Sequence, residues 1–559
     1  MNHLPLKQLS AAIALLAGSQ SAHALLPWTD AVQAANVIYI SGGAAQDAAF
    51  SNVIENVLAE SGTLDTFGDA TTTTSSNFGA RWTAYYFKAK SSFTQGLGGQ
   101  NVVVVKRSLG AAGYGVVPVI AGSELEELDI SRLTGVDGTT VLEEGGAGSR
   151  KYRVVVTSGN AANTLANVVS DAGILGHDAK LILKPGSINY PAAVPRVNAT
   201  GSDVFPGNIA AVPGNFTQLN TGGQVHGIAV TSDFYKVLQA AQVISGTLPA
   251  DTVIGDYEHE KNVPTLGRNF VGSLLAGKVE TWDQVQVVAA ADANGATTGQ
   301  DYKLTDPVIT TLAGVDVPTK VGTEVPVAVS NRNAGAAIGA IAYATFLNYP
   351  WTEGAFAPAT ATSQALEATA KPLVKQPGGV SATGNLLDDW NQGTNVSTLN
   401  NVSGAKRWGI GVQAADANAS GTKGTHPEDV AGKRHYRFVR IDGYLPSIEN
   451  VASGNYADWA EGVLLYNNDT TGKKADVVEI LTAIANGLSS PSTAGTVNQK
   501  LVTTWGNPGI FGLTSGGHSQ SIPYSDASPV VPYSHKKGSA YLGEIVPTIT
   551  GAAGGVLLK

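Results

Sequence analysis

The sequence predicts an α/β protein, and three observations carry that prediction. Short runs of β-branched and aromatic residues are typical of buried strands. A turn of small residues follows each run. Most of these turns lead into apolar residues at helical spacing. Strands that alternate with helices in this way favour layered α/β architectures with mostly parallel sheets.

The first strand, turn and helix lie near the N-terminus. Residues 36–40, Asn-Val-Ile-Tyr-Ile, predict a strand, and residues 41–46 predict a turn of small residues. A helix is expected over 47–60, and Gly62 suits its left-handed stop. The apolar residues that recur at helical spacing there are Phe50, Val53, Ile54, Val57 and Leu58.

Three later segments repeat the pattern. Ligands of parallel α/β sheets bind at the carboxyl ends of strands, so the glycine-rich turns at those ends are the candidate binding region. The predicted strands cover 101–105, 226–230 and 325–329. They are followed by the loop 106–115, by a helix that Thr231 or Ser232 caps, and by the turn 330–335 with the apolar helix 336–347.

The composition limits the class of protein. The chain has 559 residues, and its 43 % hydrophobic content is enough to form cores. A chain of this length favours two to four structural units. Charged residues make up only 14 %, against about 25 % in ordinary soluble domains. There is no cysteine, which excludes disulfide scaffolds, thiolate zinc sites, iron–sulfur clusters and cysteine nucleophiles.

Charge and hydropathy argue against two kinds of partner. The net charge is −9, and no run of lysine and arginine occurs, so nucleic acid and polybasic membrane contacts are not expected. No stretch after the N-terminal region has about 18 uninterrupted apolar residues, so no membrane insertion is expected either.

Residues 1–24 have the three parts of a secretory signal peptide. Lys7 supplies the positive charge, residues 11–17 form a short apolar region, and Ala22-His23-Ala24 fits a cleavage site. A buried first helix is the alternative. The signal predicts a periplasmic or extracellular protein, and no cysteine follows the site to carry a lipid anchor.

Several segments together resemble the phosphate-type periplasmic substrate-binding proteins. The matches occur in the order of that family between residues 37 and 456. They are 40–44 (Ile-Ser-Gly-Gly-Ala), 264–282 with its Gly277-x-x-x-x-Trp282 end, 331–335 (Asn-Arg-Asn-Ala-Gly), 435–447 with Asp442-Gly443, and 453–456 (Ser-Gly-Asn-Tyr).

The resemblance implies a type 2 periplasmic-binding fold, in which two α/β lobes enclose a ligand cleft. Lobe one would hold residues 25–232 and lobe two residues 233–404. The chain would return to lobe one over 405–559, which end in a Gly/Ser/Pro-rich segment. The implied ligand-binding residues are Ser41, Gly42, Gly43, Ala44, Arg107, Ser108, Gly113, Arg332 and Gly335.

Arg107 and Arg332 are the charged members of this set. Each follows a predicted strand and precedes a glycine turn, where a side chain of the cleft would lie. The alternative for each is an ordinary surface arginine on a loop. We expect both to contact an anion if they face one cleft.

The departures from the family concern hydroxyl groups. The family carries Gly-Ser-Gly-Thr where this chain has residues 335–338, Gly-Ala-Ala-Ile, and no serine occurs in 110–113. Alanines also occupy 44 and 45, and no acidic residue lies in 208–215. Each lost hydrogen bond to a charged group costs about 1.5–3 kcal/mol, so tight phosphate binding is not expected.

Two functions follow from these observations. The first is non-enzymatic binding of a small anion between the lobes, without metal or cofactor and with a membrane transporter as a candidate partner. The alternative is a secreted or cell-surface structural or interaction protein that keeps the scaffold and has lost phosphate binding. No Gly-x-Ser-x-Gly motif supports a hydrolase, and Val279 breaks the P-loop-like run of residues 272–278.

Overall fold

The structure is a computed structural model, and it describes most of the chain from residue 36 onwards. The predicted signal peptide of residues 1–24 lies outside the described residues. The described ranges are 36–72, 78–133, 140–145, 149–184, 187–197, 202–203, 205, 209–350, 355–379, 382–396, 401–417, 434–468, 475–499, 506–513, 529–531, 533–535 and 545–547.

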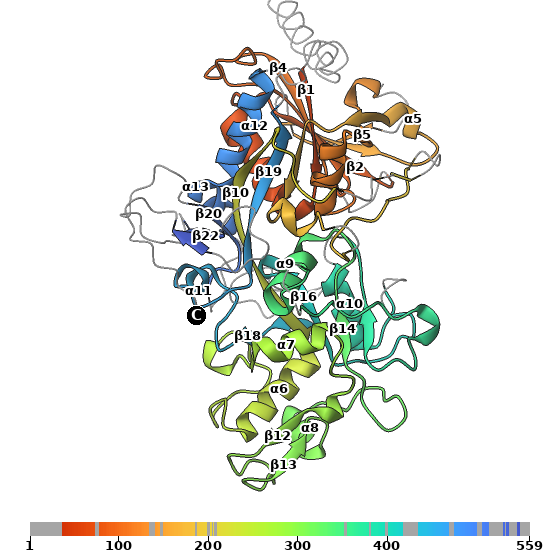
Figure 1. Cartoon of the computed structure of the whole chain (residues 1–559), viewed down its shortest axis with the longest axis vertical. Coiled ribbons are helices and arrows are strands. Elements are labelled where there is room, and N and C mark those ends of the chain that lie inside the picture. The colour runs from red at the N-terminus through yellow and green to blue at the C-terminus, as the bar shows by residue number, and fades with distance from the viewer. Residues whose placement is uncertain are drawn as a thin grey trace, which may run out of the picture.

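The chain forms two α/β lobes that share one large mixed sheet, which confirms the predicted two-lobed α/β fold (Figure 1). The strand order is β15-β14-β16-β10-β19-β9-β1-β4-β3-β2-β7-β6, with β17, β20 and β21 paired off this path. The long strand β10 (Phe216–Thr231) belongs to both lobes. Its first part pairs with β19 in lobe one, and its residues 226–230 pair with β16 in lobe two.

Lobe one contains the first predicted unit. In its centre β1 pairs in parallel with β4 and β9, and α12 packs with α3 over the apolar residues of β1 and β4. Its strands are β1 (Asn36–Gly42), β2 (Asp65–Ala70), β3 (Trp82–Lys88), β4 (Asn101–Arg107), β5 (Glu124–Leu128), β6 (Thr140–Glu144), β7 (Lys151–Val155), β8 (Leu165–Val169) and β9 (Ala172–Leu175). Its helices are α3 (Asp47–Val53), which continues as the π-helical turn η4 (Ile54–Leu58), α4 (Val117–Ala121) and α5 (Ala161–Thr164).

Lobe two contains the later predicted units. Its helices are α6 (Ser232–Ile244), α7 (Arg268–Leu275), α8 (Pro307–Ala313), α9 (Ala337–Leu347) and α10 (Ala382–Gln392). Its strands are β11 (Thr265–Leu266), β12 (Gln286–Val288), β13 (Asp301–Lys303), β14 (Ala328–Ser330), β15 (Leu373–Lys375), β16 (Gly409–Ala414), β17 (Tyr436–Phe438) and β18 (Arg440–Ile441). The strands β16 and β17 follow residue 405 and still pair with lobe-two partners or with the lobe-two end of β10.

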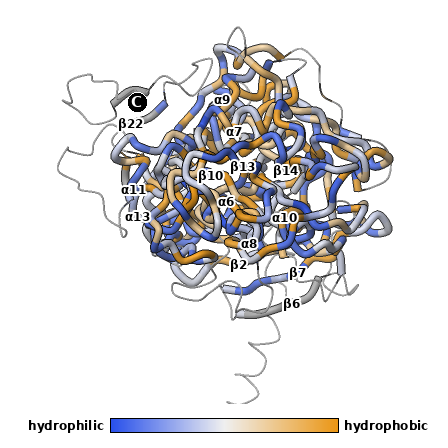
Figure 2. The backbone as a smooth tube through the Cα atoms, turned by 90° about the horizontal axis from the view of Figure 1, so that it is seen from below, coloured by the Kyte–Doolittle hydropathy of each residue, from blue (hydrophilic) through white to orange (hydrophobic). Residues whose placement is uncertain are grey.

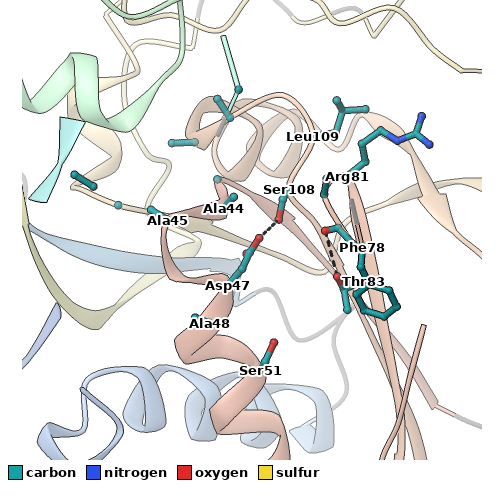
Figure 3. Close-up of a pocket in the computed structure, with 18 of the residues that line it drawn as sticks. Ala44, Ala45, Asp47, Ala48, Ser51, Phe78, Arg81, Thr83, Ser108 and Leu109 are labelled. Atoms are coloured by element: carbon teal, nitrogen blue, oxygen red, sulfur yellow. Dashed lines mark hydrogen bonds between the residues drawn. The ribbon is translucent and has the colours of Figure 1, made fainter. Parts of the chain in front are cut away.

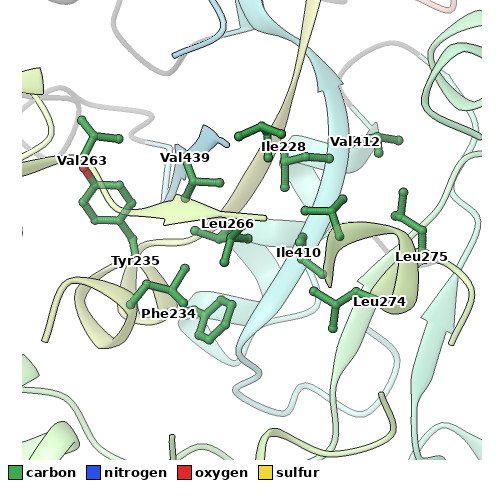
Figure 4. Packing of buried hydrophobic residues seen from close by; sticks show 14 of the residues in the cluster. Ile228, Phe234, Tyr235, Val263, Leu266, Leu274, Leu275, Ile410, Val412 and Val439 are labelled. Carbon is green, nitrogen blue, oxygen red and sulfur yellow. The ribbon is translucent and has the colours of Figure 1, made fainter. Parts of the chain in front are cut away.

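The core of lobe two lies between its helices and the end of β10. Phe234 of α6, Leu274 of α7 and Ile410 of β16 are fully buried there and face one another (Figure 4). The Trp282 ring lies 4.2 Å from the Phe234 ring, centroid to centroid, and its indole nitrogen donates to the carbonyl oxygen of Trp408. These contacts hold β16 against α6, so the turns at the ends of β14 and β16 have a rigid support.

The last part of the chain returns to lobe one through β19. Its elements are α11 (Ile448–Ala452), β19 (Trp459–Asn467), α12 (Ala475–Leu488), α13 (Pro491–Asn498), β20 (Ile510–Leu513), β21 (Val530–Val531), β22 (Tyr533–His535) and β23 (Ile545–Pro547). Within the described ranges no helix is long and apolar enough to span a bilayer, and the apolar stretches along the chain are short and interrupted (Figure 2).

The expectation of mostly parallel sheets is wrong. The parallel parts of the large sheet are β4-β1-β9 and β2-β7 in lobe one, β15-β14-β16 in lobe two, and β20-β21. Between them β10 and β19 run antiparallel to each other and to their neighbours β16 and β9. The reason is that these two long strands connect the lobes in opposite directions, which a strand–turn–helix pattern does not reveal.

Candidate functional site

A cavity with a volume of about 2090 Å³ lies between the two lobes. Lobe one lines it with the turn after β1 and the loop after β4. Lobe two lines it with the turn after β14, with Gly379 and with the end of β16. The glycine-rich turns at the strand ends therefore come together at one cavity, as the sequence predicts.

The nine predicted ligand-binding residues divide into two groups. Gly43, Ala44, Ser108 and Arg332 line the cavity. The other five, which are Ser41, Gly42, Arg107, Gly113 and Gly335, are not among the residues that line it.

Ser41 and Gly42 do not line the cavity, and their contacts fix the turn that follows β1. The Ser41 hydroxyl is fully buried and donates to the carbonyl oxygen of Tyr114 over 2.8 Å. Gly42 has a φ of 134°, and a Cβ on it would lie 1.9 Å from the carbonyl oxygen of Ile174. Only glycine fits this position, because the backbone of β9 occupies the space of a side chain.

Gly113 and Gly335 join the two lobes. The amide of Gly113 donates to the carbonyl oxygen of Gly335 over 3.0 Å. Pro191 lies against both: a Cβ on Gly113 would be 2.6 Å from the Pro191 Cβ, and one on Gly335 would be 3.0 Å from the Pro191 Cα. These glycines let the lobes approach closely, and the Gly113 amide is already used.

Arg107 does not face the cavity, which corrects the expectation from the sequence. Its guanidinium is 3.1 Å from the Asp203 carboxylate, and the two side chains are 1 % and 2 % exposed. The group also donates to the carbonyl oxygens of Glu126 and Leu109 and lies over the Tyr114 ring. A strand turns successive side chains to opposite faces, and Arg107, the last residue of β4, is held by a carboxylate far along the chain.

The Asp47 carboxylate lies in the wall of lobe one, where Ser108 and Lys106 are its partners (Figure 3). The Ser108 hydroxyl donates to Asp47 Oδ2 over 2.7 Å and accepts from the buried Lys106 ammonium over 3.0 Å. Lys106 Nζ also lies 3.4 Å from Asp47 Oδ1. The hydrogen of the Ser108 hydroxyl is thus already used. From the sequence, Asp47 has no expected role beyond the first turn of a helix.

Arg332 is the charged group of the lobe-two wall. Its side chain is buried, with 7 % of the residue exposed. It donates to the Thr383 hydroxyl over 3.2 Å and to the Gly379 carbonyl oxygen over 2.8 Å. Its Nε has no hydrogen-bond partner, and no carboxylate in the described part of the chain pairs with it. Burial lowers the pKa of the guanidinium to about 10, so it stays protonated at neutral pH.

Two amide side chains lie beside Arg332. The parallel strands β14 and β16 place Ser330 next to Gly411, so Arg332 and Gln413 follow two residues later at the same end of these strands. Asn333 Oδ1 is buried without a hydrogen-bond partner among the described residues, and Gln413 Nε2 is buried in a side chain that interacts with the Tyr436 hydroxyl. Both residues line the cavity. Gln413 was not expected here, because the sequence pattern predicts no strand over 409–414.

The N-terminus of α9 also meets the cavity. Ala336, Ala337 and Ile338 line it, and Ala336 at the cap position offers no capping side chain. The first N–H groups of a helix have no partner within the helix and carry a partial positive charge. This end of α9 therefore adds donors of the right sign for an anion to the buried Arg332.

Methyl groups occupy much of the remaining wall. Where the sequence lacks the hydroxyl groups of the family it resembles, alanines line the cavity. They are Ala44, Ala45, Ala111, Ala112, Ala336 and Ala337. Ile338 and Val412 extend this apolar surface.

Asp416 is a titratable group of the same wall. Burial raises the pKa of its carboxyl to about 6, and its Oδ2 accepts from Gln224 Nε2 over 3.1 Å. No group of three or more His, Asp or Glu residues in the described ranges is arranged to hold a metal ion.

No known protein family matches the sequence, and no curated protein matches it either. The chain path is similar to a proposed phosphate ABC transporter substrate-binding protein with bound phosphate from Clostridium perfringens, at 10 % identity and a TM-score of 0.34 over 85 % of this chain and 99 % of that one. PstS from Borrelia burgdorferi matches at 8 % identity and a TM-score of 0.29, over 83 % of this chain and 97 % of that one. An ABC-type phosphate transport receptor from Vibrio cholerae matches at 11 % identity and 0.24, over 60 % and 82 %. The similarity is distant, so the ligand has to be inferred from the residues that line the cavity.

Proposed function

We propose that this protein binds a small anionic solute in the cavity between its lobes, without catalysis. The observation that carries the proposal is Arg332, a buried guanidinium that lines the cavity and has no carboxylate partner in the described part of the chain. A buried charge without a partner costs several kcal/mol, and a bound anion would supply the missing negative charge.

Two further features support an anion at this place. The uncapped N-terminus of α9 favours negative charge, and its cap residue Ala336 lies four residues after Arg332. Gln413 Nε2 is a second buried donor on the same wall. Residues of lobe one line the other side of the cavity, so both lobes would enclose the anion.

The place of this function in the cell is part of the proposal. The signal-like residues 1–24 favour a protein that acts in the periplasm or outside the cell. A membrane transporter that accepts the captured solute is the candidate partner.

Thermal unfolding with and without added anions tests the proposal. A ligand at about 100 times its dissociation constant adds about 2.7 kcal/mol to the free energy of unfolding, which is a clear rise in Tm. We expect such a rise for the wild type with a panel of carboxylates and oxyanions, and none for Arg332→Gln. Arg434→Gln is the matched control, because Arg434 lines the same cavity but pairs with Asp388 at 2.8 Å.

The control variant should keep the ligand-induced rise. A rise that survives in Arg332→Gln, or no rise with any anion, contradicts the proposal. The second result favours the structural or interaction role that the sequence left open.

A further inference from the structure

Among the cations that line the cavity, one is buried and lacks a carboxylate partner in the described ranges. Of the other cations that line it, Arg81 and Arg434 pair with Asp69 and Asp388. Lys90 donates to the carbonyl oxygen of Asn56, and Lys151 is exposed. Arg332 is the buried lining cation that lacks a carboxylate in the described ranges. The carboxyl groups of Asp47, Glu55, Glu60 and Asp416 line the same space. A dianion such as hydrogen phosphate would bring a second, unbalanced negative charge towards them.

The walls offer more apolar surface than an inorganic oxyanion can use. Fourteen alanines, Ile338 and Val412 line the cavity, and the Ser108 hydroxyl has already given its hydrogen to Asp47. The volume of about 2090 Å³ exceeds the usual range of about 300–1,000 Å³ for sites of drug-sized ligands. An inorganic ion would leave these methyl groups in contact with water.

An organic acid matches both features. Its carboxylate carries one charge and two oxygens, which Arg332 Nε, Gln413 Nε2 and the N-terminus of α9 can meet from one side. Its carbon atoms would displace water from the alanines and from Ile338. Each methylene that leaves water raises affinity about fourfold.

We infer that the ligand class is an organic monocarboxylate with an apolar body, and that inorganic phosphate and sulfate are not ligands. This inference rests on the proposed function, since it names the chemistry of the solute that the same cavity takes. The carboxylate lies at Arg332 and the apolar body along the alanine wall.

Isothermal titration calorimetry with a homologous series tests the inference. The probes are acetate, butyrate and hexanoate, with phosphate and sulfate as inorganic anions and hexanamide as the uncharged analogue. We expect the Kd to fall about fourfold for each added methylene, and we expect no saturable heat from phosphate, sulfate or hexanamide. Arg332→Gln should lose binding of all three carboxylates.

The apolar part of the inference has its own variant. Ile338→Asn should reduce the dependence of the Kd on chain length, because it places a polar group on the apolar wall. Val288→Asn is the matched control, since Val288 is 54 % exposed on β12 and is not a lining residue. This control variant should leave the Kd of each carboxylate in the series unchanged.

The outcomes separate the inference from the proposed function. Arg332-dependent binding of phosphate or sulfate, or equal affinities for acetate and hexanoate, overturns the inference and leaves anion binding in place. Binding of hexanamide as tight as hexanoate overturns it too. Failure of every anion to bind, or binding that Arg332→Gln does not change, overturns the proposed function itself.

Discussion

Arg107 and Asp203 form a buried ion pair of 3.1 Å beneath the wall of lobe one. Arg196 also reaches this carboxylate, at 3.0 Å. Arg332 is almost as buried and has no such partner in the part of the chain that the structure describes. The two arginines follow strands in the same way, yet one is part of the scaffold and the other lines the cavity.

This contrast predicts that replacing each arginine by methionine has a different effect on the free energy of unfolding. Arg107→Met should lower the free energy of unfolding by about 3 kcal/mol, because it leaves the buried Asp203 carboxylate with a weaker set of partners. Arg332→Met removes a buried charge that lacks a carboxylate, so the ligand-free protein should keep its stability within about 1 kcal/mol or gain some. Chemical denaturation of both variants measures the difference. A loss for Arg332→Met as large as that for Arg107→Met contradicts this distinction.

A capping residue at the start of α9 should separate stability from binding. Ala336 has the extended backbone of a cap residue, with φ −78° and ψ 126°, and no capping side chain. Ala336→Asp should stabilise the ligand-free protein by about 1 kcal/mol, because its carboxylate accepts from the free N–H groups of the helix. The same carboxylate would occupy the anion position, so carboxylate binding should be lost. Chemical denaturation and calorimetry report the two effects, and a variant that binds anions as the wild type does would argue against this position of the site.

Gly42 should tolerate no side chain. Gly42→Ala places a Cβ 1.9 Å from the Ile174 carbonyl oxygen, which requires β1 and β9 to separate, and we expect a loss of at least about 3 kcal/mol. Gly62→Ala is the control. Gly62 has a φ of 75° and open space around the missing Cβ, so only the cost of the left-handed backbone, about 1 kcal/mol, should appear. Equal losses of unfolding free energy in urea denaturation would mean that the Ile174 carbonyl oxygen of β9 does not exclude a side chain at Gly42.

Asp458 should make the stability depend on pH. It is 2 % exposed, and both carboxylate oxygens lack a hydrogen-bond partner among the described residues. Burial raises the pKa of this carboxyl from 3.8 to about 7, although the Arg268 charge opposes the rise. The folded protein then binds more protons than the unfolded chain between these values, so the free energy of unfolding falls as pH rises from about 4 to about 7.

Asp458→Asn removes this dependence. Its stability advantage over the wild type should grow by about 2 kcal/mol between about pH 5.5 and about pH 8, as the buried carboxyl of the wild type loses its proton. Denaturant titrations of both proteins at the two pH values give the difference. An advantage that is the same at both values would show that the Asp458 carboxyl has an ordinary pKa.

The sequence predicts local structure well where the pattern is local. The strand from residue 36, the helix from Asp47, and α9 at Ala337–Leu347 lie where the spacing of apolar residues puts them. The mixed sheet was not predictable in this way, because β10 and β19 pair over more than 200 residues of sequence. The order of their pairing depends on contacts that no short window contains.

The sequence predicts where the cavity lies but not which side chains face it. The turns after β1, β4 and β14 do meet at one cavity. Whether an arginine at such a turn faces the cavity depends on distant partners: Asp203 holds Arg107 away from it, and no carboxylate in the described ranges holds Arg332. Asp47 and Gln413 became visible only with the fold, since Asp47 is 61 residues from its hydroxyl partner and Gln413 lies in a strand that the sequence pattern did not predict.

The most direct test of the central claim is a crystal structure of the protein with 6-bromohexanoate, in which anomalous scattering locates the bromine atom. We predict carboxylate density against Arg332 Nε and the N-terminus of α9, with the bromine peak along the alanine wall of the cavity. A bromine peak outside the cavity, or a carboxylate within it that does not contact Arg332, would contradict the claim that this arginine holds the ligand.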